Sequence, residues 1–258
     1  MRCTVDPILQ IKDLQTHFFT KAGVLKAVDG VSLEIKSGEI VGLVGESGSG
    51  KSITGFSIMG LVDAPGQIVG GQILFKGQDL AKLSPAEMQA YRGNRIAMIF
   101  QDPMMTLNPV LRIETQMVET ILSHDSSVSK VDAHARARDA LGLVGISSPD
   151  ERLRAYPHQF SGGMRQRVSI AIAMLNRPDL IIADEPTTAL DVTIQGQVIH
   201  EMQRLCQDTK TALLWITHDL AVVAGIAERI CVMYAGRIVE QGANANVIAA
   251  PIHPYTKS

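Results

Sequence analysis

Eight residues near the beginning of the chain have the pattern of a loop that binds phosphate. They follow the spacing Gly-x-x-x-x-Gly-Lys-Ser and are, in order, Gly45, Glu46, Ser47, Gly48, Ser49, Gly50, Lys51 and Ser52. Glycines let backbone N–H groups turn toward phosphate oxygens, and the helix expected over 50–59 adds the positive end of its dipole. We expect Lys51 to contact the β- and γ-phosphates of a nucleoside triphosphate and Ser52 to bind Mg²⁺. The alternative, a glycine-rich turn without function, leaves the Lys-Ser pair between a strand and a helix unexplained.

Two carboxylates follow a second apolar run, residues 180–183. Asp184 is placed to complete the Mg²⁺ shell, and Glu185 can face a water in line with the γ-phosphorus as a general base. The alternative is that the pair caps a helix after Pro186.

Two polar residues also follow apolar runs that we expect to be strands. Gln101 follows residues 96–100, and its amide can reach Mg²⁺ or the attacking water. His218 follows residues 212–217. In doubly wound sheets ligands lie at the carboxyl ends of the strands, so we assign His218 a contact to the γ-phosphate. His124 and His134 lie in polar sequence and are expected to be solvated.

A second glycine-containing motif is Ser161-Gly162-Gly163-Met164. Ser161 is a good N-cap for a helix over 162–176, whose apolar positions recur with helical spacing. The N-terminus of such a helix is an anion site.

Phe18 or Phe19 can stack on the adenine ring of a nucleotide, and we favour Phe18. The alternative is that both belong to the core, as neighbouring aromatic residues more often do.

Composition and charge exclude several classes of protein. The net charge of −2 provides no general attraction to nucleic acid. The three cysteines, Cys3, Cys206 and Cys231, suit a reducing compartment and predict neither a disulfide framework nor a metal cluster. The N-terminus does not have the pattern of a signal peptide, and the apolar runs are shorter than the roughly 20 residues of a membrane span. If the protein works at a membrane, another chain must supply the membrane-spanning segments.

The pattern of apolar residues predicts an α/β fold. Strands are expected over 8–14 and over 25–35, the latter as two short pieces broken at Asp29-Gly30, and these N-terminal segments favour an antiparallel sheet. Another strand is expected over 68–75. The unbroken apolar runs 40–44, 96–100, 180–183 and 212–217 are typical of buried parallel strands. A helical insert is expected at about 113–160, followed by a helix over 194–207 and a final pair of strands at 229–234 and 237–241.

In combination these motifs resemble those of ATP-binding cassette (ABC) ATPases. Residues 45–52 resemble the Walker A loop, 180–185 the Walker B strand, Gln101 the Q-loop, 161–164 the signature, Ala189-Leu190-Asp191 the D-loop and His218 the switch histidine. They occur in the order and at the spacing of that family. Met164 departs from it, because the commonest signature has glutamine there.

The resemblance implies a single domain over 1–258. It would comprise a P-loop NTPase core with a mainly parallel sheet, an N-terminal antiparallel β-subdomain and the helical insert carrying the signature motif. It implies hydrolysis of ATP with Mg²⁺, and binding of ATP across a dimer in which Ser161, Gly162 and Gly163 face the nucleotide of a second ABC ATPase subunit. A related but different partner is favoured, with a homodimer as the alternative. The resemblance implies that the chain lies at the cytoplasmic face of the inner membrane, where it binds two membrane-spanning permease subunits. A solute-binding protein would be only an indirect partner.

Longer sequence segments resemble those of the ATPase subunits of bacterial dipeptide and oligopeptide importers, with nickel importers as the alternative. They include residues 98–103, 107–109, 156–159 and His253-Pro254-Tyr255-Thr256. Many such relatives continue into a segment that can hold an iron–sulfur cluster. This chain stops at Ser258, so that extension is expected to be absent and the cluster is not carried over. A soluble ABC ATPase acting on DNA or ribosomes and a P-loop kinase are disfavoured. The first usually has coiled-coil inserts, zinc sites or two cassettes, and the second has no need of residues 161–164.

Overall fold

The computed structural model describes residues 6–188, 190 and 192–257, which form two compact units. The first unit contains residues up to 89 and from 210 onward, and the second contains residues 90–209. The helical insert predicted at about 113–160 lies within the second unit, and the assignment of 1–258 as one domain stays a prediction.

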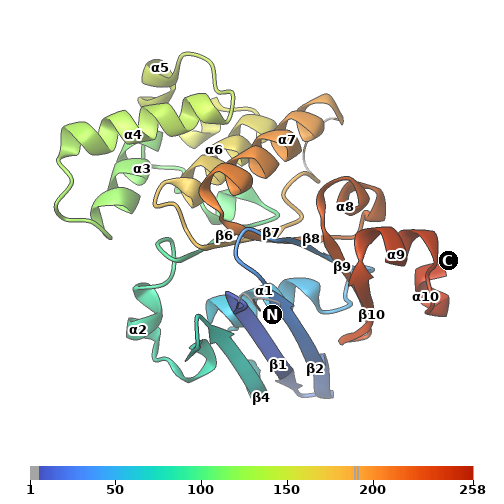
Figure 1. Cartoon of the computed structure of the whole chain (residues 1–258). Coiled ribbons are helices and arrows are strands. Elements are labelled where there is room, and N and C mark those ends of the chain that lie inside the picture. The colour runs from blue at the N-terminus through green and yellow to red at the C-terminus, as the bar shows by residue number, and fades with distance from the viewer. Residues whose placement is uncertain (1–5, 189, 191, 258) are drawn as a thin grey trace. The chain divides into compact units, whose positions relative to one another are not determined.

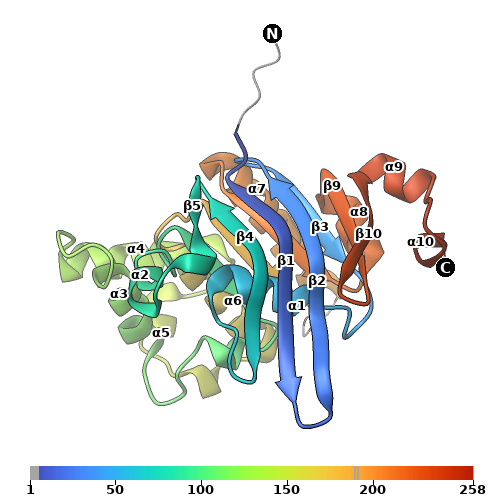
Figure 2. The same ribbon diagram turned by 90° about the horizontal axis from the view of Figure 1, so that it is seen from below.

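An antiparallel sheet occupies the N-terminal part of the first unit. Its strands are β1 (Leu9–Thr20), β2 (Gly23–Ile35), β4 (Gly66–Phe75) and β5 (Gln78–Asp79), in the order β2-β1-β4-β5. Figure 2 shows β1, β2 and β4 side by side along their length. The predicted break at Asp29-Gly30 is wrong. Leu14 pairs with Val31 and Gln15 with Asp29, so Gly30, with φ at 84°, is the extra residue of a bulge inside one continuous strand.

The first unit also contains four further strands, β3 (Ile40–Val44), β8 (Ala212–Thr217), β9 (Arg229–Tyr234) and β10 (Arg237–Ala243), in the order β10-β9-β3-β8. β3 runs parallel to β8 and β9, and β10 is antiparallel to β9. All residues of β3 and β8 are buried, as expected for central parallel strands. The helices of this unit are α1 (Lys51–Met59), η1 (Leu80–Lys82), α2 (Pro85–Gln89), α8 (Leu220–Ile226), α9 (Asn244–Ala249) and α10 (Pro254–Lys257).

The second unit combines a parallel strand pair with helices (Figure 1). β6 (Ile96–Ile99) runs parallel to β7 (Leu180–Asp184). The helices are η2 (Pro103–Met105), α3 (Ile113–Leu122), α4 (Lys130–Leu143), α5 (Pro149–Leu153), η3 (Pro157–Gln159), α6 (Gly162–Met174) and α7 (Val192–Thr209). α3 and α4 pack through residues spaced by four, Met117 and Ile121 on one helix and Ala133, Ala137 and Leu141 on the other, all fully buried.

The structure therefore confirms the predicted α/β class, with an antiparallel N-terminal sheet, mainly parallel strands elsewhere and helices between them. In the part of the chain that the structure describes, no helix is both long enough and apolar enough to cross a membrane.

Candidate functional site

The predicted phosphate loop connects β3 to α1 in the first unit. Its close packing requires glycine at two positions. A Cβ atom at Gly45 would lie 2.1 Å from the Met233 carbonyl oxygen, and one at Gly50, where φ is 104°, would lie 2.2 Å from the Ala27 carbonyl oxygen. Both distances are far shorter than van der Waals contact, so any side chain here would open the loop.

The ammonium group of Lys51 lies inside this loop. The residue is 5% exposed, and its Nζ donates hydrogen bonds to the carbonyl oxygens of Gly45 at 2.7 Å and Glu46 at 2.8 Å. No side chain caps the N-terminus of α1, since its N-cap residue is Gly50. A cation, a helix N-terminus and a tight glycine backbone are thus gathered around one loop, which fits a polyphosphate.

The first unit also carries Phe18 and His218. Phe18 is half-buried in β1 and its ring lies over Gly66, where a Cβ atom would come within 2.7 Å of it, whereas Phe19 is 47% exposed. His218 is exposed and directly follows β8. Asp219 holds the turn behind it, because its carboxylate accepts hydrogen bonds from the backbone N–H groups of Ala221 and Val222. The roles of Phe18 and His218 stay predictions.

The acidic pair lies at the end of β7 in the second unit. Asp184 is the last residue of the strand and is 4% exposed. Glu185 follows it with φ at 49°, a left-handed conformation that is uncommon for a non-glycine residue and is often found at functional sites. The hydroxyl of Thr188 donates a hydrogen bond to the Glu185 carboxylate at 2.7 Å, within the turn that follows the strand.

Gln101 lies just beyond β6 and is exposed. The strand ends at Ile99, one residue earlier than predicted, and after Phe100 the chain bends at Gln101 and Asp102. The buried side chain of Gln166 on α6 donates to the Phe100 carbonyl oxygen at 3.5 Å, so the residue before Gln101 is attached to the helix that carries the glycine motif.

Ser161 caps α6 as predicted. Its hydroxyl accepts a hydrogen bond from the Met164 N–H at 3.3 Å, and the first turn of the helix contains no acidic residue. A Cβ atom at Gly162 would meet nothing within 4 Å, so this turn is open on that side. The helix ends at Met174, two residues earlier than predicted. An exposed helix N-terminus of this kind can bind an anion.

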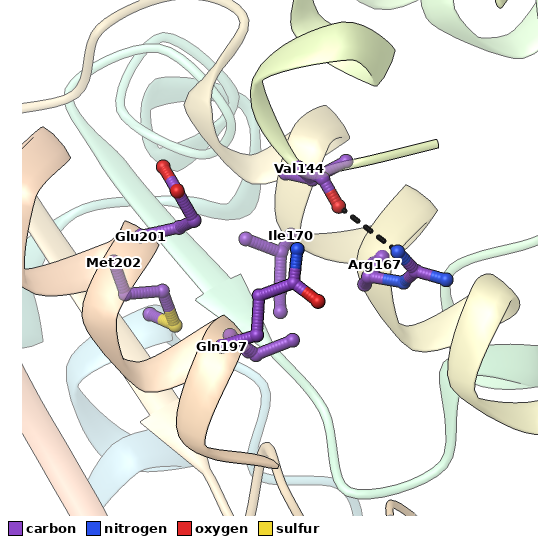
Figure 3. Close-up of a pocket in the computed structure, with 7 residues that line it drawn as sticks. Val144, Arg167, Ile170, Gln197, Glu201 and Met202 are labelled. Atoms are coloured by element: carbon purple, nitrogen blue, oxygen red, sulfur yellow. Dashed lines mark hydrogen bonds between the residues drawn. The ribbon is translucent and has the colours of Figure 1, made fainter. Parts of the chain in front are cut away.

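A small hollow between α6 and α7 is separate from these residues (Figure 3). It is lined by Val144, Arg167, Ile170, Gln197, Val198, Glu201 and Met202, and Arg167 donates to the Val144 and Gly145 carbonyl oxygens at its edge. Its volume of about 10 Å³ is at the lower limit for one water molecule, so it cannot hold a nucleotide.

The described residues contain no cluster of three or more His, Cys, Asp or Glu side chains suited to a metal ion. Mg²⁺ usually keeps several waters and is bound by one or two carboxylates together with substrate phosphates. The predicted ligands are hard oxygen donors of the kind that suits Mg²⁺: the Ser52 hydroxyl in the first unit, and the Gln101 amide oxygen and the Asp184 carboxylate in the second. Their binding of one Mg²⁺ ion stays a prediction.

Ala189 and Asp191 of the predicted D-loop lie outside the described residues. Tyr255 was not among the predicted site residues, although its hydroxyl oxygen accepts a hydrogen bond from the Glu46 N–H in the phosphate loop at 2.8 Å. The phrase His253-Pro254-Tyr255-Thr256 was the available signal, but no local pattern linked it to a loop so far away in the sequence.

Comparison with known proteins agrees with this arrangement of motifs. The profile of the ABC transporter family matches residues 28–188, which include the phosphate loop, the glycine motif of α6 and the acidic pair. The chain belongs to the ABC transporter family. It is an ABC ATPase domain, as the sequence predicted.

Relatives and solved structures support the same family. The chain is 50% identical over 254 residues to a probable peptide ABC transporter ATP-binding protein of Sinorhizobium fredii, covering 98% of this chain and 76% of the relative. It is 49% identical over 251 residues to the dipeptide transport ATP-binding protein DppD of Escherichia coli, covering 97% and 76% respectively. The dimeric ATP-binding cassette MJ0796, in a post-hydrolysis state with ADP and phosphate, superposes with a TM-score of 0.83 at 26% identity, covering 92% of this chain and 98% of that one.

Proposed function

We propose that this ABC ATPase supplies the energy for import of peptides through partner permease subunits. The phosphate loop carries the proposal, because Lys51 and the glycines around it form a site for a polyphosphate. The names of relatives that share about half of its residues point to peptides as the solute. Nickel is the alternative solute that the sequence left open.

The residues have separate roles in this proposal. Lys51 binds the β- and γ-phosphates, and the N–H groups at the start of α1 complete the anion site. Ser52, Asp184 and Gln101 hold Mg²⁺, which when bound neutralises phosphate charge. Glu185 accepts a proton from the attacking water, and His218 contacts the γ-phosphate. Phe18 stacks on adenine, with Phe19 as the alternative.

We also propose that the glycine motif of α6 acts on the nucleotide of a second ABC ATPase subunit. Ser161, Gly162 and Gly163 present an uncovered helix N-terminus without a neighbouring acidic residue. A dimeric cassette among the similar solved structures supports this arrangement. The partner would be a related but different chain, with a homodimer as the alternative for the isolated protein.

The permease subunits would dock on the segment that follows Gln101, at the cytoplasmic face of the inner membrane. Met105 is 64% exposed and Val110 is 75% exposed, so this segment offers apolar contact. Leu107, in the same segment, is only 1% exposed, so its side chain is not available for this contact. A solute-binding protein would take part only indirectly.

The proposal is tested in membrane vesicles that contain the native complex. ATP-dependent uptake of a radiolabelled dipeptide is compared with uptake of nickel. In the purified chain, Lys51→Ala should weaken ATP binding on the order of 100-fold, because charge-assisted contacts to phosphate are lost. Lys12→Ala, at an exposed position of β1, is the matched control and should bind ATP normally. Unchanged affinity in folded Lys51→Ala, or ATP-dependent uptake of nickel without peptide, would contradict the proposal.

A further inference from the structure

Helix α10 is attached to the phosphate loop by one hydrogen bond. The N–H of Glu46 donates to the hydroxyl oxygen of Tyr255 at 2.8 Å. Both residues belong to the first unit, although 209 positions separate them in the sequence. Glu46 is exposed and Tyr255 is half-buried, so the contact lies at the surface of the loop.

The same peptide group is held from its other side by Lys51. The carbonyl of Gly45 and the N–H of Glu46 belong to one planar unit, and that carbonyl accepts the hydrogen bond from Lys51 Nζ at 2.7 Å. Because the two groups of a trans peptide point in opposite directions, Tyr255 and Lys51 hold opposite edges of one plane. A rotation of this plane would break both hydrogen bonds.

Tyr255 is itself well fixed. Its ring lies 4.8 Å from the ring of Tyr234 between centroids, and its N–H donates to His253 Nδ1 at 3.2 Å. The carboxylate of Glu240 on β10 accepts hydrogen bonds from the N–H groups of Ile252 at 2.9 Å and His253 at 3.0 Å. The hydroxyl of Tyr255 is therefore presented to the loop by a segment with its own hydrogen-bond partners.

A second contact holds the other end of the loop. The N–H of Gly236, in the turn between β9 and β10, donates to the Ser49 carbonyl oxygen at 2.9 Å. The exposed residues 46–48 thus lie between two attachment points that come from the last part of the chain. Such attachment lowers the entropy that the loop loses when it binds a ligand.

We propose that Tyr255 is a positioning residue for ATP, which orients the Gly45–Glu46 peptide and through it places Lys51 for the phosphates. This inference rests on the proposed function, because it takes residues 45–52 to be the phosphate site. It extends that function to a residue outside the loop, and it gives a role to Tyr255 of the segment His253-Pro254-Tyr255-Thr256.

Tyr255→Phe tests the proposal, since it removes the hydroxyl and keeps the ring that packs on Tyr234. A typical hydrogen bond predicts a dissociation constant for MgATP and a KM that are about 3- to 10-fold higher, with kcat and the melting temperature unchanged. Calorimetry, steady-state kinetics and thermal unfolding measure these values. Tyr234→Phe is the matched control, and it should bind MgATP like the unaltered chain.

Glu240→Ala provides a second route to the same contact, because it removes the acceptor for Ile252 and His253 and loosens α10. It should also weaken MgATP binding, and adding Tyr255→Phe to it should cause little further loss. Unchanged affinity in Tyr255→Phe, an equal loss in Tyr234→Phe, or fully additive losses in the double variant would overturn the inference. Lys51→Ala in the same assay separates the two ideas: if it still binds MgATP, the proposed function fails as well.

Discussion

The hydroxyl of Thr188 donates a hydrogen bond to the carboxylate of Glu185 at 2.7 Å, across a turn in which Glu185 has φ at 49°. A left-handed residue of this kind costs of order 1–3 kcal/mol and persists only where its surroundings impose it. The turn and the hydrogen bond together hold the carboxylate in one place, as a general base requires.

Glu185→Gln should therefore keep ATP binding and slow hydrolysis. The amide has nearly the same shape but cannot accept the proton of the attacking water. Loss of a general base slows the reaction by about 10²- to 10⁴-fold, which corresponds to about 3–5 kcal/mol in the barrier. Phosphate release measures the rate and calorimetry the affinity. Glu151→Gln on the exposed surface of α5 is the control, and turnover by Glu185→Gln at the rate of the unaltered chain would assign the base elsewhere, with His218 the first candidate.

Ser161→Arg should block hydrolysis in the partner's phosphate loop without weakening ATP binding at Lys51 of the same chain. The reason is that a bulky cation at the N-terminus of α6 obstructs the anion site. Ser126→Arg, at an exposed position between α3 and α4, is the control.

A mixing experiment tests whether the motif acts across the dimer. Lys51→Ala and Ser161→Arg subunits should each be inactive, while an equimolar mixture regains activity in dimers that contain one of each. Such a dimer has one site with both changes and one site with neither. The experiment uses homodimers of the isolated chain, whose formation is checked by sedimentation. A mixture that forms these dimers and stays inactive, or activity of an unmixed chain that does not depend on its concentration, would place the motif on its own nucleotide.

Met105→Glu should detach the chain from its permease subunits and leave ATP binding intact. Met105 is 64% exposed, so the charge carries little cost for the isolated chain, whereas it would be buried in an apolar interface. The double change with Met104→Glu should act in the same direction with some loss of stability, because Met104 is half-buried. Val131→Glu on α4, at a position 79% exposed, is the control. Co-sedimentation with membranes measures the effect, and full association of Met105→Glu would move the docking surface elsewhere.

Acid should release the segment before α10 from β10. The hydrogen bonds from the N–H groups of Ile252 and His253 hold the pKa of Glu240 below its usual value of 4.5. Since the folded pKa is depressed, this contribution to stability is complete above pH 4.5 and is lost as the pH falls through the folded pKa. Hydrogen exchange at the Ile252 and His253 amides should therefore accelerate in acid, beyond the intrinsic pH dependence of exchange. Glu240→Gln should remove this acceleration. Equal protection of both amides above pH 4.5 and below the folded pKa of Glu240 in the unaltered chain would contradict the prediction.

Much of the site is local in sequence and was therefore predictable. The phosphate loop needs only its glycines, the Lys-Ser pair, a buried strand before it and a helix after it, and the structure has β3 ending at Val44 and α1 beginning at Lys51. Ser161 caps α6 through an N–H three residues later, and the carboxylates of Asp184 and Glu185 follow an apolar strand directly. In each case the residues that determine the geometry lie within a few positions of one another.

Tertiary structure decided the features that depend on distant residues. β2 continues through Asp29-Gly30 because its partner β1 accommodates a bulge there, and Leu107 is buried because other parts of the second unit cover it. The hydrogen bond from Glu46 to Tyr255 has no local signature, since its geometry exists only once β9, β10 and α10 have packed beside the phosphate loop. Short-range motifs thus determined which family this chain belongs to, and long-range packing determined that the Gly45–Glu46 peptide is held between Lys51 and Tyr255.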